Sequence, residues 1–220
     1  GNAGALCMQT SFSPDGKRII IAAFENVLLF DRLGNFIAQT EKIQAVRLSF
    51  AKFSPDGNYL IIVFKNNIPG LYAYALNLAT GILVILKGHK AQINNLTFSS
   101  DGKKLLTASE DKTIICWDYT TGKVLNSFNG HNNSVNVVGF SKDDQYIVSA
   151  SDDNFLKVWK IDDGKLIYSI AAINNTDYII LRPDGYYKCT PDAAKQLYYI
   201  DESNNKIGFT QLDIRYNRPD

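Results

Sequence analysis

The sequence of 220 residues is poor in the residues from which metal sites and disulfide scaffolds are built. It contains three cysteines, Cys7, Cys116 and Cys189, and two histidines, His89 and His131. The cysteines lie far apart and form no CxxC pair, which favours a reducing compartment over a disulfide-stapled fold. Zinc takes about four ligands, and no spacing of these residues predicts a metal site. We therefore expect no metal and no cofactor, a packing role for Cys116, and a cytoplasmic location.

Charge imbalance and long apolar runs are also absent. Lys and Arg number 23 against 22 Asp and Glu, a formal net charge of +1. This balance gives no overall field that would attract nucleic acid or an anionic membrane. The longest apolar runs, such as "RIIIAAF" and "YLIIVF", are too short to cross a bilayer. We therefore expect neither nucleic acid nor a membrane as a partner.

What the sequence does contain is an internal repeat. The word "FSPDG" at residues 12–16 returns at 53–57, and is followed by "FSSDG", "FSKDD" and "LRPDG". The aspartates of these words are 41, 45, 42 and 41 residues apart: Asp15, Asp56, Asp101, Asp143 and Asp184. Such a period predicts a repeat protein. The expected organisation is one region of five units, at approximately 5–42, 43–90, 91–132, 133–172 and 173–220.

Each unit has the pattern of four short strands. The third reads "INNLTF", "KLLTAS", "TIICWD" and "VLNSF", separated by "SSDGK", "EDK" and "YTTGK". Strands rich in β-branched, Leu and aromatic residues between such turns predict an antiparallel meander, and no segment shows a helical period. The predicted fold is all-β, a β-propeller whose four-stranded blades stack radially to bury both faces. A β-sandwich or an open solenoid fits these units less well.

The repeated aspartates have two interpretations. A ring of carboxylates would suit an enzyme, but each aspartate lies in a "PDG"- or "SDG"-like turn. There Asp stabilises the bend and Gly takes positive φ. We therefore interpret the words as turns between the first two strands of a blade. Their Phe is expected to be the last core-facing residue before the bend.

Two units share a more specific pattern. Gly88-His89, Asp111 and Trp117-Asp118 are matched by Gly130-His131, Asp153 and Trp159-Lys160. In both, His precedes Asp by 22 residues and Asp precedes Trp by six. This pattern resembles the WD-repeat β-propeller family. The resemblance implies a buried hydrogen-bonded tetrad in each unit, with one of two hydroxyls as the linker: His89, Thr107 or Ser109, Asp111 and Trp117; His131, Ser149 or Ser151, Asp153 and Trp159.

The other units depart from this pattern, and closure of the ring stays open. Phe30-Asp31, Tyr74-Ala75 and Ile200-Asp201 stand where Trp-Asp is expected. Five units leave three alternatives: a five-bladed ring, part of a larger propeller, or an open arc whose strand edges pair between copies. The segment "DYIILRPDGYY…GFTQLDIRYNRPD" resembles the last blade of bacterial WD-repeat proteins associated with caspase-like peptidases. That resemblance implies a longer bacterial regulatory or signalling protein.

The resemblance implies a non-catalytic scaffold for a protein or peptide partner. Both histidines belong to the implied tetrads, so no catalytic residue is predicted. The alternative is a hydrolase with its site in the central channel, which would need converging acids or a nucleophile with its base. Loops on rigid scaffolds often carry recognition, which gives these partner-binding candidates: Lys90, Gln92, Glu110, Lys112, Asn132, Ser134, Asp152, Asn154, and, in a longer loop of the second unit, Asn66, Asn67 and Tyr72.

Overall fold

The strands form a series of antiparallel sheets. The computed structural model describes residues 7–23, 26–40, 47–65, 73–200 and 206–208. The first sheet contains β1 (Cys7–Phe12), β2 (Arg18–Ala23), β3 (Val27–Asp31) and β4 (Phe36–Gln39). The second contains β5 (Arg47–Phe53), β6 (Tyr59–Lys65), β7 (Ala73–Asn77) and β8 (Leu83–Ile85). The third contains β9 (Ile93–Phe98), β10 (Leu105–Ser109), β11 (Thr113–Asp118) and β12 (Lys123–Asn129). The prediction of four-stranded antiparallel sheets is confirmed.

The fourth sheet is larger than one unit. It contains β13 (Val135–Phe140), β14 (Tyr146–Ser151), β15 (Phe155–Lys160), β16 (Leu166–Ala172), β17 (Tyr178–Leu181) and β18 (Tyr187–Cys189). The last two strands belong to the fifth unit by sequence, yet β17 pairs with β16 instead of starting a new sheet. The tight turn between them is stabilised by the Asn174 side chain, which accepts hydrogen bonds from the backbone N–H groups of Thr176 and Asp177 at 2.9 Å each.

A short helix interrupts the fifth unit. After α1 (Pro191–Gln196), a two-stranded sheet of β19 (Tyr198–Ile200) and β20 (Lys206–Gly208) follows. The expectation that no segment is helical is wrong here, because six residues are too few to display a helical period. Proline at the first helical position fits, since its missing N–H would have no partner there.

The repeated words form the predicted turns. In the first, the Ser13 hydroxyl donates to Asp15 at 2.6 Å and the backbone N–H of Lys17 donates to the same carboxylate at 3.1 Å. Gly16 has a φ of 67°. The Ser13 hydrogen bond and that of Lys17 hold the pKa of Asp15 below its ordinary value. Ser54, Ser99 and Ser141 bind the next three aspartates in the same way. These carboxylates are therefore occupied within their own turns.

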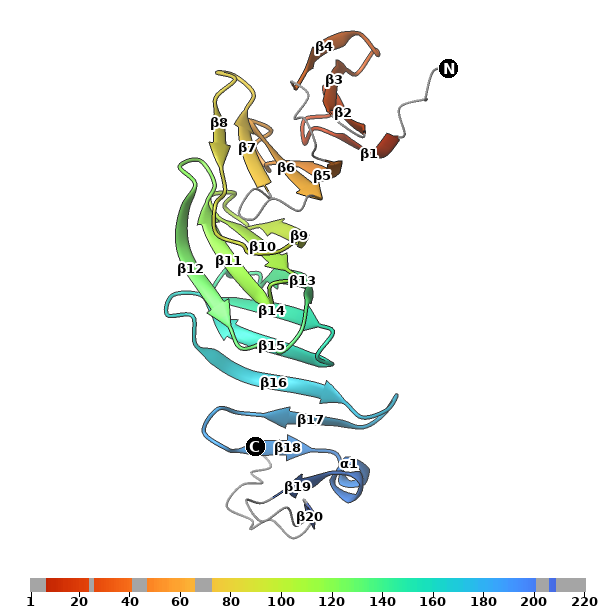
Figure 1. Ribbon diagram of the computed structural model, residues 1–220, viewed down its shortest axis with the longest axis vertical. Helices are drawn as coiled ribbons and strands as arrows, with labels where there is room; N and C mark the ends of the chain where they lie inside the picture. Colours follow the sequence, from red (N-terminus) through yellow and green to blue (C-terminus); the bar gives the residue numbers. More distant parts are fainter. Residues whose placement is uncertain (1–6, 24–25, 41–46, 66–72, 201–205, 209–220) are drawn as a thin grey trace.

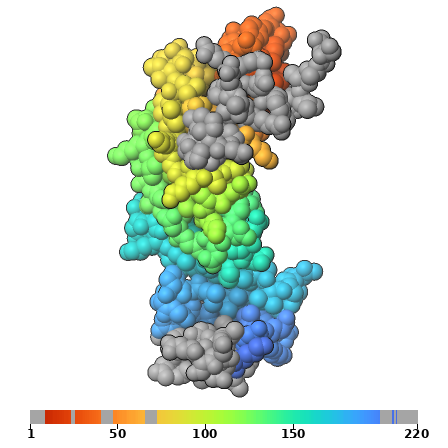
Figure 2. Space-filling view, in the orientation of Figure 1, coloured from red at the N-terminus to blue at the C-terminus, as the bar shows by residue number. Residues whose placement is uncertain are grey.

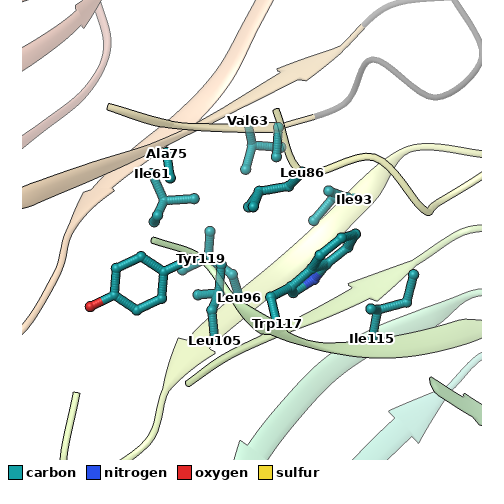
Figure 3. Close-up of a cluster of buried hydrophobic side chains, with 11 residues drawn as sticks. Ile61, Val63, Ala75, Leu86, Ile93, Leu96, Leu105, Ile115, Trp117 and Tyr119 are labelled. Carbon is teal, nitrogen blue, oxygen red and sulfur yellow. The ribbon is translucent and has the colours of Figure 1, made fainter. Parts of the chain in front are cut away.

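The core lies between the sheets. One apolar cluster fills each of the three junctions among the four sheets, and Figure 3 shows the one between the second and third. There Ile61, Val63 and Ala75 of the second sheet meet Leu105, Trp117 and Tyr119 of the third. Each sheet thus has a leading face, which packs on the preceding sheet, and a trailing face, which packs on the following one.

The sheets follow one another as an open stack. In Figure 1, the innermost strands β5, β9 and β13 lie on the right, and the outer strands β8 and β12 lie on the left. The first sheet and the β19–β20 hairpin are at opposite ends of the long axis, and Figure 2 shows the units between them as successive bands. Across the part of the chain that the structure describes, the five units do not close into a ring.

Phe12 is an exception to the expected packing of the repeated word. Phe53, in the second copy of "FSPDG", is only 5% exposed, whereas Phe12, in the first copy, is 61% exposed. The expectation that Phe12 faces the core is wrong, because the described residues place no preceding sheet against the leading face of the first sheet.

Candidate interaction surface on the third and fourth sheets

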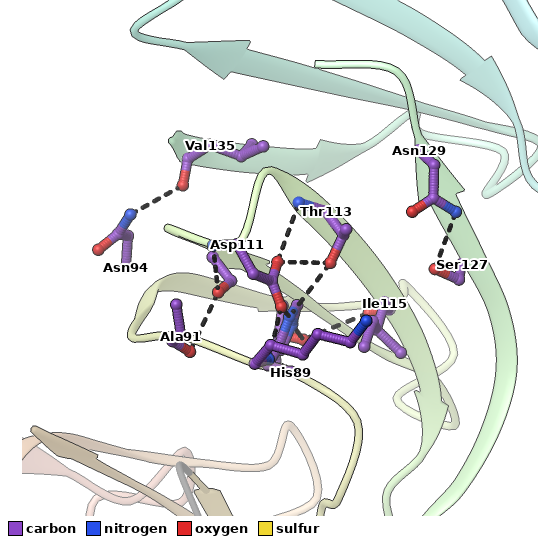
Figure 4. Close-up of polar contacts among 12 residues, drawn as sticks. His89, Ala91, Asn94, Asp111, Thr113, Ile115, Ser127, Asn129 and Val135 are labelled. Atoms are coloured by element: carbon purple, nitrogen blue, oxygen red, sulfur yellow. Dashed lines mark hydrogen bonds and ion pairs between the residues drawn. The ribbon is translucent and has the colours of Figure 1, made fainter. Parts of the chain in front are cut away.

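The third sheet contains a buried chain of polar side chains. His89 Nδ1 is 2.9 Å from Asp111 Oδ2, and His89 Nε2 is 2.7 Å from Thr107 Oγ1. Trp117 Nε1–H donates to the same Thr107 oxygen at 2.8 Å. Figure 4 shows His89 beneath Asp111 and Thr113, which close the outer end of the chain. Of the two hydroxyls left open by the sequence, Thr107 is the one that links His to Trp.

The hydrogen bonds of this chain run in one direction. Indole N–H is only a donor, so Thr107 Oγ1 accepts from Trp117 and has its own hydrogen left to donate to His89 Nε2. In the tautomer of His89 that carries its proton on Nδ1, this nitrogen donates to Asp111. Burial opposes the ionisation of Asp111, but the bonds from His89, Thr113 and the Lys90 backbone hold its pKa well below the ordinary value.

The fourth sheet repeats the arrangement. His131 lies 2.8 Å from both Asp153 and Ser149, and Trp159 donates to Ser149 at 2.9 Å. Burial lowers the pKa of His131 below its ordinary value of 6.5, against the effect of Asp153, and the charge of Lys157 acts in the same direction as burial. The pKa of Asp153 is also lowered, because bonds from Asn132 and His131 outweigh its burial. A neutral His131 imidazole and an ionised Asp153 carboxylate are consistent with these two lowered pKa values.

The remaining hydroxyls of the pattern hold the aspartate loops. Ser109 donates to the Ala91 carbonyl at 3.1 Å and accepts the Asp111 backbone N–H at 3.1 Å. Ser151 does the same with Asn133 and Asp153, again at 3.1 Å. Each tetrad aspartate in turn accepts a backbone N–H from the loop that follows the preceding sheet's last strand, Lys90 or Asn132. In each of the two sheets, these hydrogen bonds therefore join the loop that follows the histidine to the turn that contains the aspartate.

The glycine of each Gly-His pair makes room for the indole. A Cβ added to Gly88 would lie 2.7 Å from Trp117 Cη2, and one added to Gly130 would lie 3.2 Å from Trp159. Trp117 and Trp159 are 0% and 2% exposed. The Gly-His spacing thus reflects contact of the loop backbone with the tryptophan ring.

Five of the partner-binding candidates are exposed on these tied loops. Lys90 and Asn132 follow the tetrad histidines, and Glu110, Lys112 and Asn154 form turns between the second and third strands. Lys112 and Asn154 have φ angles of 72° and 67°. Asparagine tolerates this left-handed conformation, whereas lysine is strained in it. Lys112 thus places a cation at the tip of the loop although its backbone is strained there.

Three other candidates are engaged in hydrogen bonds. Gln92 donates to the Phe64 carbonyl of the second sheet at 2.9 Å. Ser134 accepts from Asn94 of the third sheet at 2.9 Å, and the exposed Asp152 accepts from Asn136. These contacts link neighbouring strands and sheets. Candidates Asn66, Asn67 and Tyr72 lie outside the described residues.

A contact that the sequence analysis missed joins the third and fourth sheets at their other end. Asp144 replaces the glycine of the repeated word and keeps its positive φ, 54°. Its carboxylate accepts the Ser100 backbone N–H at 2.9 Å and the Ser100 hydroxyl. In the sequence, the replacement of "DG" by "DD" at residues 143–144 is the feature that could have indicated this contact.

A cavity of about 630 Å³ lies between the first and second sheets. The described residues that line it are mainly apolar and include Leu29, Ala38, Leu76 and Leu83, and none of them is charged. The sequence carries no signal for it, because it depends on the spacing of two sheets.

Other kinds of site were also sought. Among the residues that the structure describes, no three His, Cys, Asp or Glu side chains come close enough to hold a metal. Cys116 is buried, which raises the pKa of its thiol to about 11. The described helix α1 is far too short to cross a membrane.

The two segments that contain the tetrads match a known family of repeats. Residues 81–118 and 122–160 match the family described as "WD domain, G-beta repeat". The chain contains WD40 repeats. The two matched segments include Asp111 with Trp117 and Asp153 with Trp159, and WD40 repeats indicate a protein-interaction scaffold.

Several proteins are similar to about half of the chain. Apoptotic protease-activating factor 1 of Mus musculus is 32% identical over 110 residues, which cover 49% of this chain and 8% of that protein. COMPASS component SWD3 of Saccharomyces cerevisiae is 29% identical over 118 residues, 53% of this chain and 36% of that protein. An uncharacterised WD repeat-containing protein of Synechocystis is 27% identical over 120 residues, 53% of this chain and 33% of that protein. The matches thus span about a third or less of these relatives.

Proposed function

We propose that the chain is a non-catalytic scaffold that binds a protein or peptide across the tied loops of its third and fourth sheets. The observation that carries this proposal is the pairing of a buried tetrad with exposed loop tips in two adjacent sheets. The tetrads fix the loop backbones, so binding costs little ordering of the scaffold. The exposed Glu110, Lys112, Asn132 and Asn154 then offer charges and amides to a polar partner.

The strain at Lys112 supports a role in binding. A residue held at positive φ reduces stability unless something else favours it. Lys112→Asn keeps the turn, removes the cation and relieves the strain. We expect this variant to be as stable as the wild type or more stable by up to about 1 kcal/mol, as denaturant unfolding will measure.

The experiment is a selection of random peptides on the full chain, followed by affinity measurements with the variants. We expect selected peptides to lose at least about tenfold in affinity, 1.4 kcal/mol, for Lys112→Asn. The matched control is Lys103→Asn, because Lys103 is an exposed lysine directly after the repeated word, at the opposite end of the same sheet. Equal affinities for Lys112→Asn and the wild type, or equal losses in both variants, would contradict the proposal.

We further propose that the chain works within a longer bacterial regulatory or signalling protein in the cytoplasm. The similarity to a cyanobacterial WD repeat-containing protein and the short share of each relative that is matched support this. The link to caspase-like peptidases depends on a C-terminal segment whose last part lies outside the described residues. Sequencing of the complete gene tests whether the chain is part of a longer protein and whether that protein contains a peptidase domain. A gene with no further coding sequence would contradict both.

A further inference from the structure

The cavity between the first and second sheets can be compared with the same place at the other two junctions. Leu60 and Leu105 are equivalent in their sheets, because each lies opposite the phenylalanine of a repeated word. On the next strand Leu60 opposes Leu76, and Leu105 opposes Trp117. Leu76 therefore stands where the third sheet has its tetrad tryptophan, and the expectation that Tyr74 takes this position is wrong.

At the other two junctions this place is filled by an indole ring and a second large apolar side chain. Trp117 packs with Leu86 in one apolar cluster, which Figure 3 shows. The rings of Trp159 and Phe128 lie edge to face, with their centroids 6.1 Å apart. In both pairs the tryptophan comes from one sheet and its neighbour from the preceding one. The space beside a tetrad thus accepts an aromatic ring between two sheets.

The first junction has a smaller residue at each of the two places. Leu76 replaces the tryptophan. Thr40 replaces Leu86, because the backbone N–H of each donates to the carbonyl of the first residue in the third strand of its sheet. Leu76 lines the cavity and is partly exposed, whereas Trp117 is 0% exposed. The smaller side chains leave space where the other junctions are filled.

The turn after the third strand of each sheet gives an independent measure of this opening. A Cβ added to Gly122 would lie 2.8 Å from the Ile85 backbone oxygen of the preceding sheet, and one added to Gly164 would lie 3.0 Å from Asn126. The equivalent Gly81, which lines the cavity, has no atom of the described residues within 4 Å of that position. The outer end of the first junction is therefore open where the other two are in direct contact.

The chemistry of the walls limits what can enter. Both walls belong to complete four-stranded sheets, and the described residues that line them carry no charge. A charged ligand would lose its hydration there without gaining a counter-charge. The amide side chains of Gln39 and Asn77 are among the few polar groups of the lining. A volume of about 630 Å³ lies in the range of small-molecule pockets.

We propose that this cavity binds a small uncharged aromatic molecule, with its ring in the place that the Trp117 and Trp159 rings occupy at the other junctions. Burial of the ring between two apolar walls supplies most of the affinity. The amides of Gln39 and Asn77 offer a donor and an acceptor to one polar group of the ligand. This site is separate from the proposed peptide-binding loops, which belong to the third and fourth sheets.

The experiment titrates the full chain with an indole that carries one fluorine atom, followed by fluorine NMR. We expect saturable binding with a dissociation constant below about 1 mM. Leu76→Trp places the missing ring inside the cavity, so it should weaken binding at least about tenfold. Leu125→Trp is the matched control, because it makes the same change at a 45% exposed leucine of β12, and it should bind like the wild type.

A second ligand and hydrogen exchange test where the probe binds. Fluorinated indoleacetate adds a carboxylate to the same ring and should bind at least about tenfold more weakly than the indole. The bound indole should slow amide exchange in β4, which forms part of one wall, and leave β12 unchanged.

Four outcomes would overturn the proposal. The first is the absence of saturable binding. The second is equal affinity in Leu76→Trp and the wild type, which would place the probe on another apolar surface. The third is equal affinity for the indole and the indoleacetate, and the fourth is protection confined to β12. Circular dichroism and thermal unfolding identify a variant that fails to fold, and Ala38→Leu, from the opposite wall, then replaces Leu76→Trp.

Discussion

At the scale of single residues, the tetrads matter because each donor has an acceptor. The Trp117–Thr107–His89–Asp111 chain and its counterpart in the fourth sheet leave none of their buried polar atoms without a partner. A satisfied buried network positions its surroundings, but one missing member exposes the others to the full cost of desolvation. The loops that form the candidate surface depend on these few side chains.

Removal of a tetrad histidine tests this dependence. His131→Ala should lower the free energy of unfolding by about 1–3 kcal/mol, because Ser149 and Asp153 lose buried partners. Denaturant unfolding measures the loss. Asn132→Ala, at the exposed neighbour, should change it by less than about 0.5 kcal/mol. Equal stabilities of His131→Ala and the wild type would contradict a structural role.

The same histidine should make stability depend on pH. Its pKa is lowered in the folded chain from 6.5, chiefly by burial, with Lys157 acting in the same direction and Asp153 in opposition. Below pH 6.5 the unfolded chain therefore binds more protons than the folded chain, so the free energy of unfolding falls as the pH is lowered through this window. His131→Gln should remove this part of the slope between pH 7 and pH 5. An identical slope in both proteins would contradict the assignment.

The glycine beside each tryptophan gives a steric prediction. Gly88→Ala would place a methyl group 2.7 Å from Trp117 and 3.0 Å from Ile115, so we expect a loss of about 1–3 kcal/mol. Gly139→Ala is the matched control, because its nearest neighbour would lie at an ordinary 3.7 Å. Thermal unfolding of both variants measures the difference, and equal transition temperatures would contradict the close packing.

At the scale of elements, the turn between β13 and β14 does more than reverse the chain. It uses Asp144 where the other words use glycine, and the strained aspartate binds Ser100 of the adjacent sheet. A strained residue persists where its contacts compensate for its backbone energy. This turn thus links two sheets that otherwise meet mainly through apolar side chains.

Two substitutions separate the strain from the link. Asp144→Ala keeps the positive φ and loses the bonds to Ser100, so we expect a loss of about 1–2 kcal/mol. Asp144→Gly loses the same bonds but relieves the strain, and should be more stable than Asp144→Ala by about 1 kcal/mol. Denaturant unfolding gives the order, and an alanine variant as stable as the wild type would show that the link contributes nothing.

At the scale of the whole molecule, stability is distributed unevenly along the stack. In a repeat protein each unit is stabilised mainly by its neighbours. β10 and most of β11 are buried between two sheets, whereas every residue of β4 is exposed. The middle of the stack is therefore the most protected part and the first sheet the least.

Hydrogen exchange followed by mass spectrometry tests this gradient. At concentrations where the chain is a single copy, amides of β10 and β11 should exchange most slowly and those of β4 fastest. The fourth sheet should lie between them, because its trailing face is open. Exchange of β4 as slow as that of β10 would contradict the open stack.

The sequence by itself determined the local features of this protein. The 41- to 45-residue spacing predicted the units, and the strand and turn patterns predicted their four-stranded sheets. The family resemblance carried by the Gly-His, Asp and Trp spacing predicted both hydrogen-bonded chains, with two hydroxyls left open in each. These features are readable because turn chemistry, strand alternation and the fixed register of a hairpin act over a few residues.

Only the tertiary structure decided how the units meet. It selected Thr107 and Ser149, which bond the tetrad histidines, over Ser109 and Ser151, which lie at the strand ends and bond the loop backbone instead. It joined β17 to β16, where no Gly-His loop ties the chain to a new sheet. It also left Phe12 exposed although the identical word buries Phe53. Burial depends on what lies across a junction, and that partner is distant in sequence.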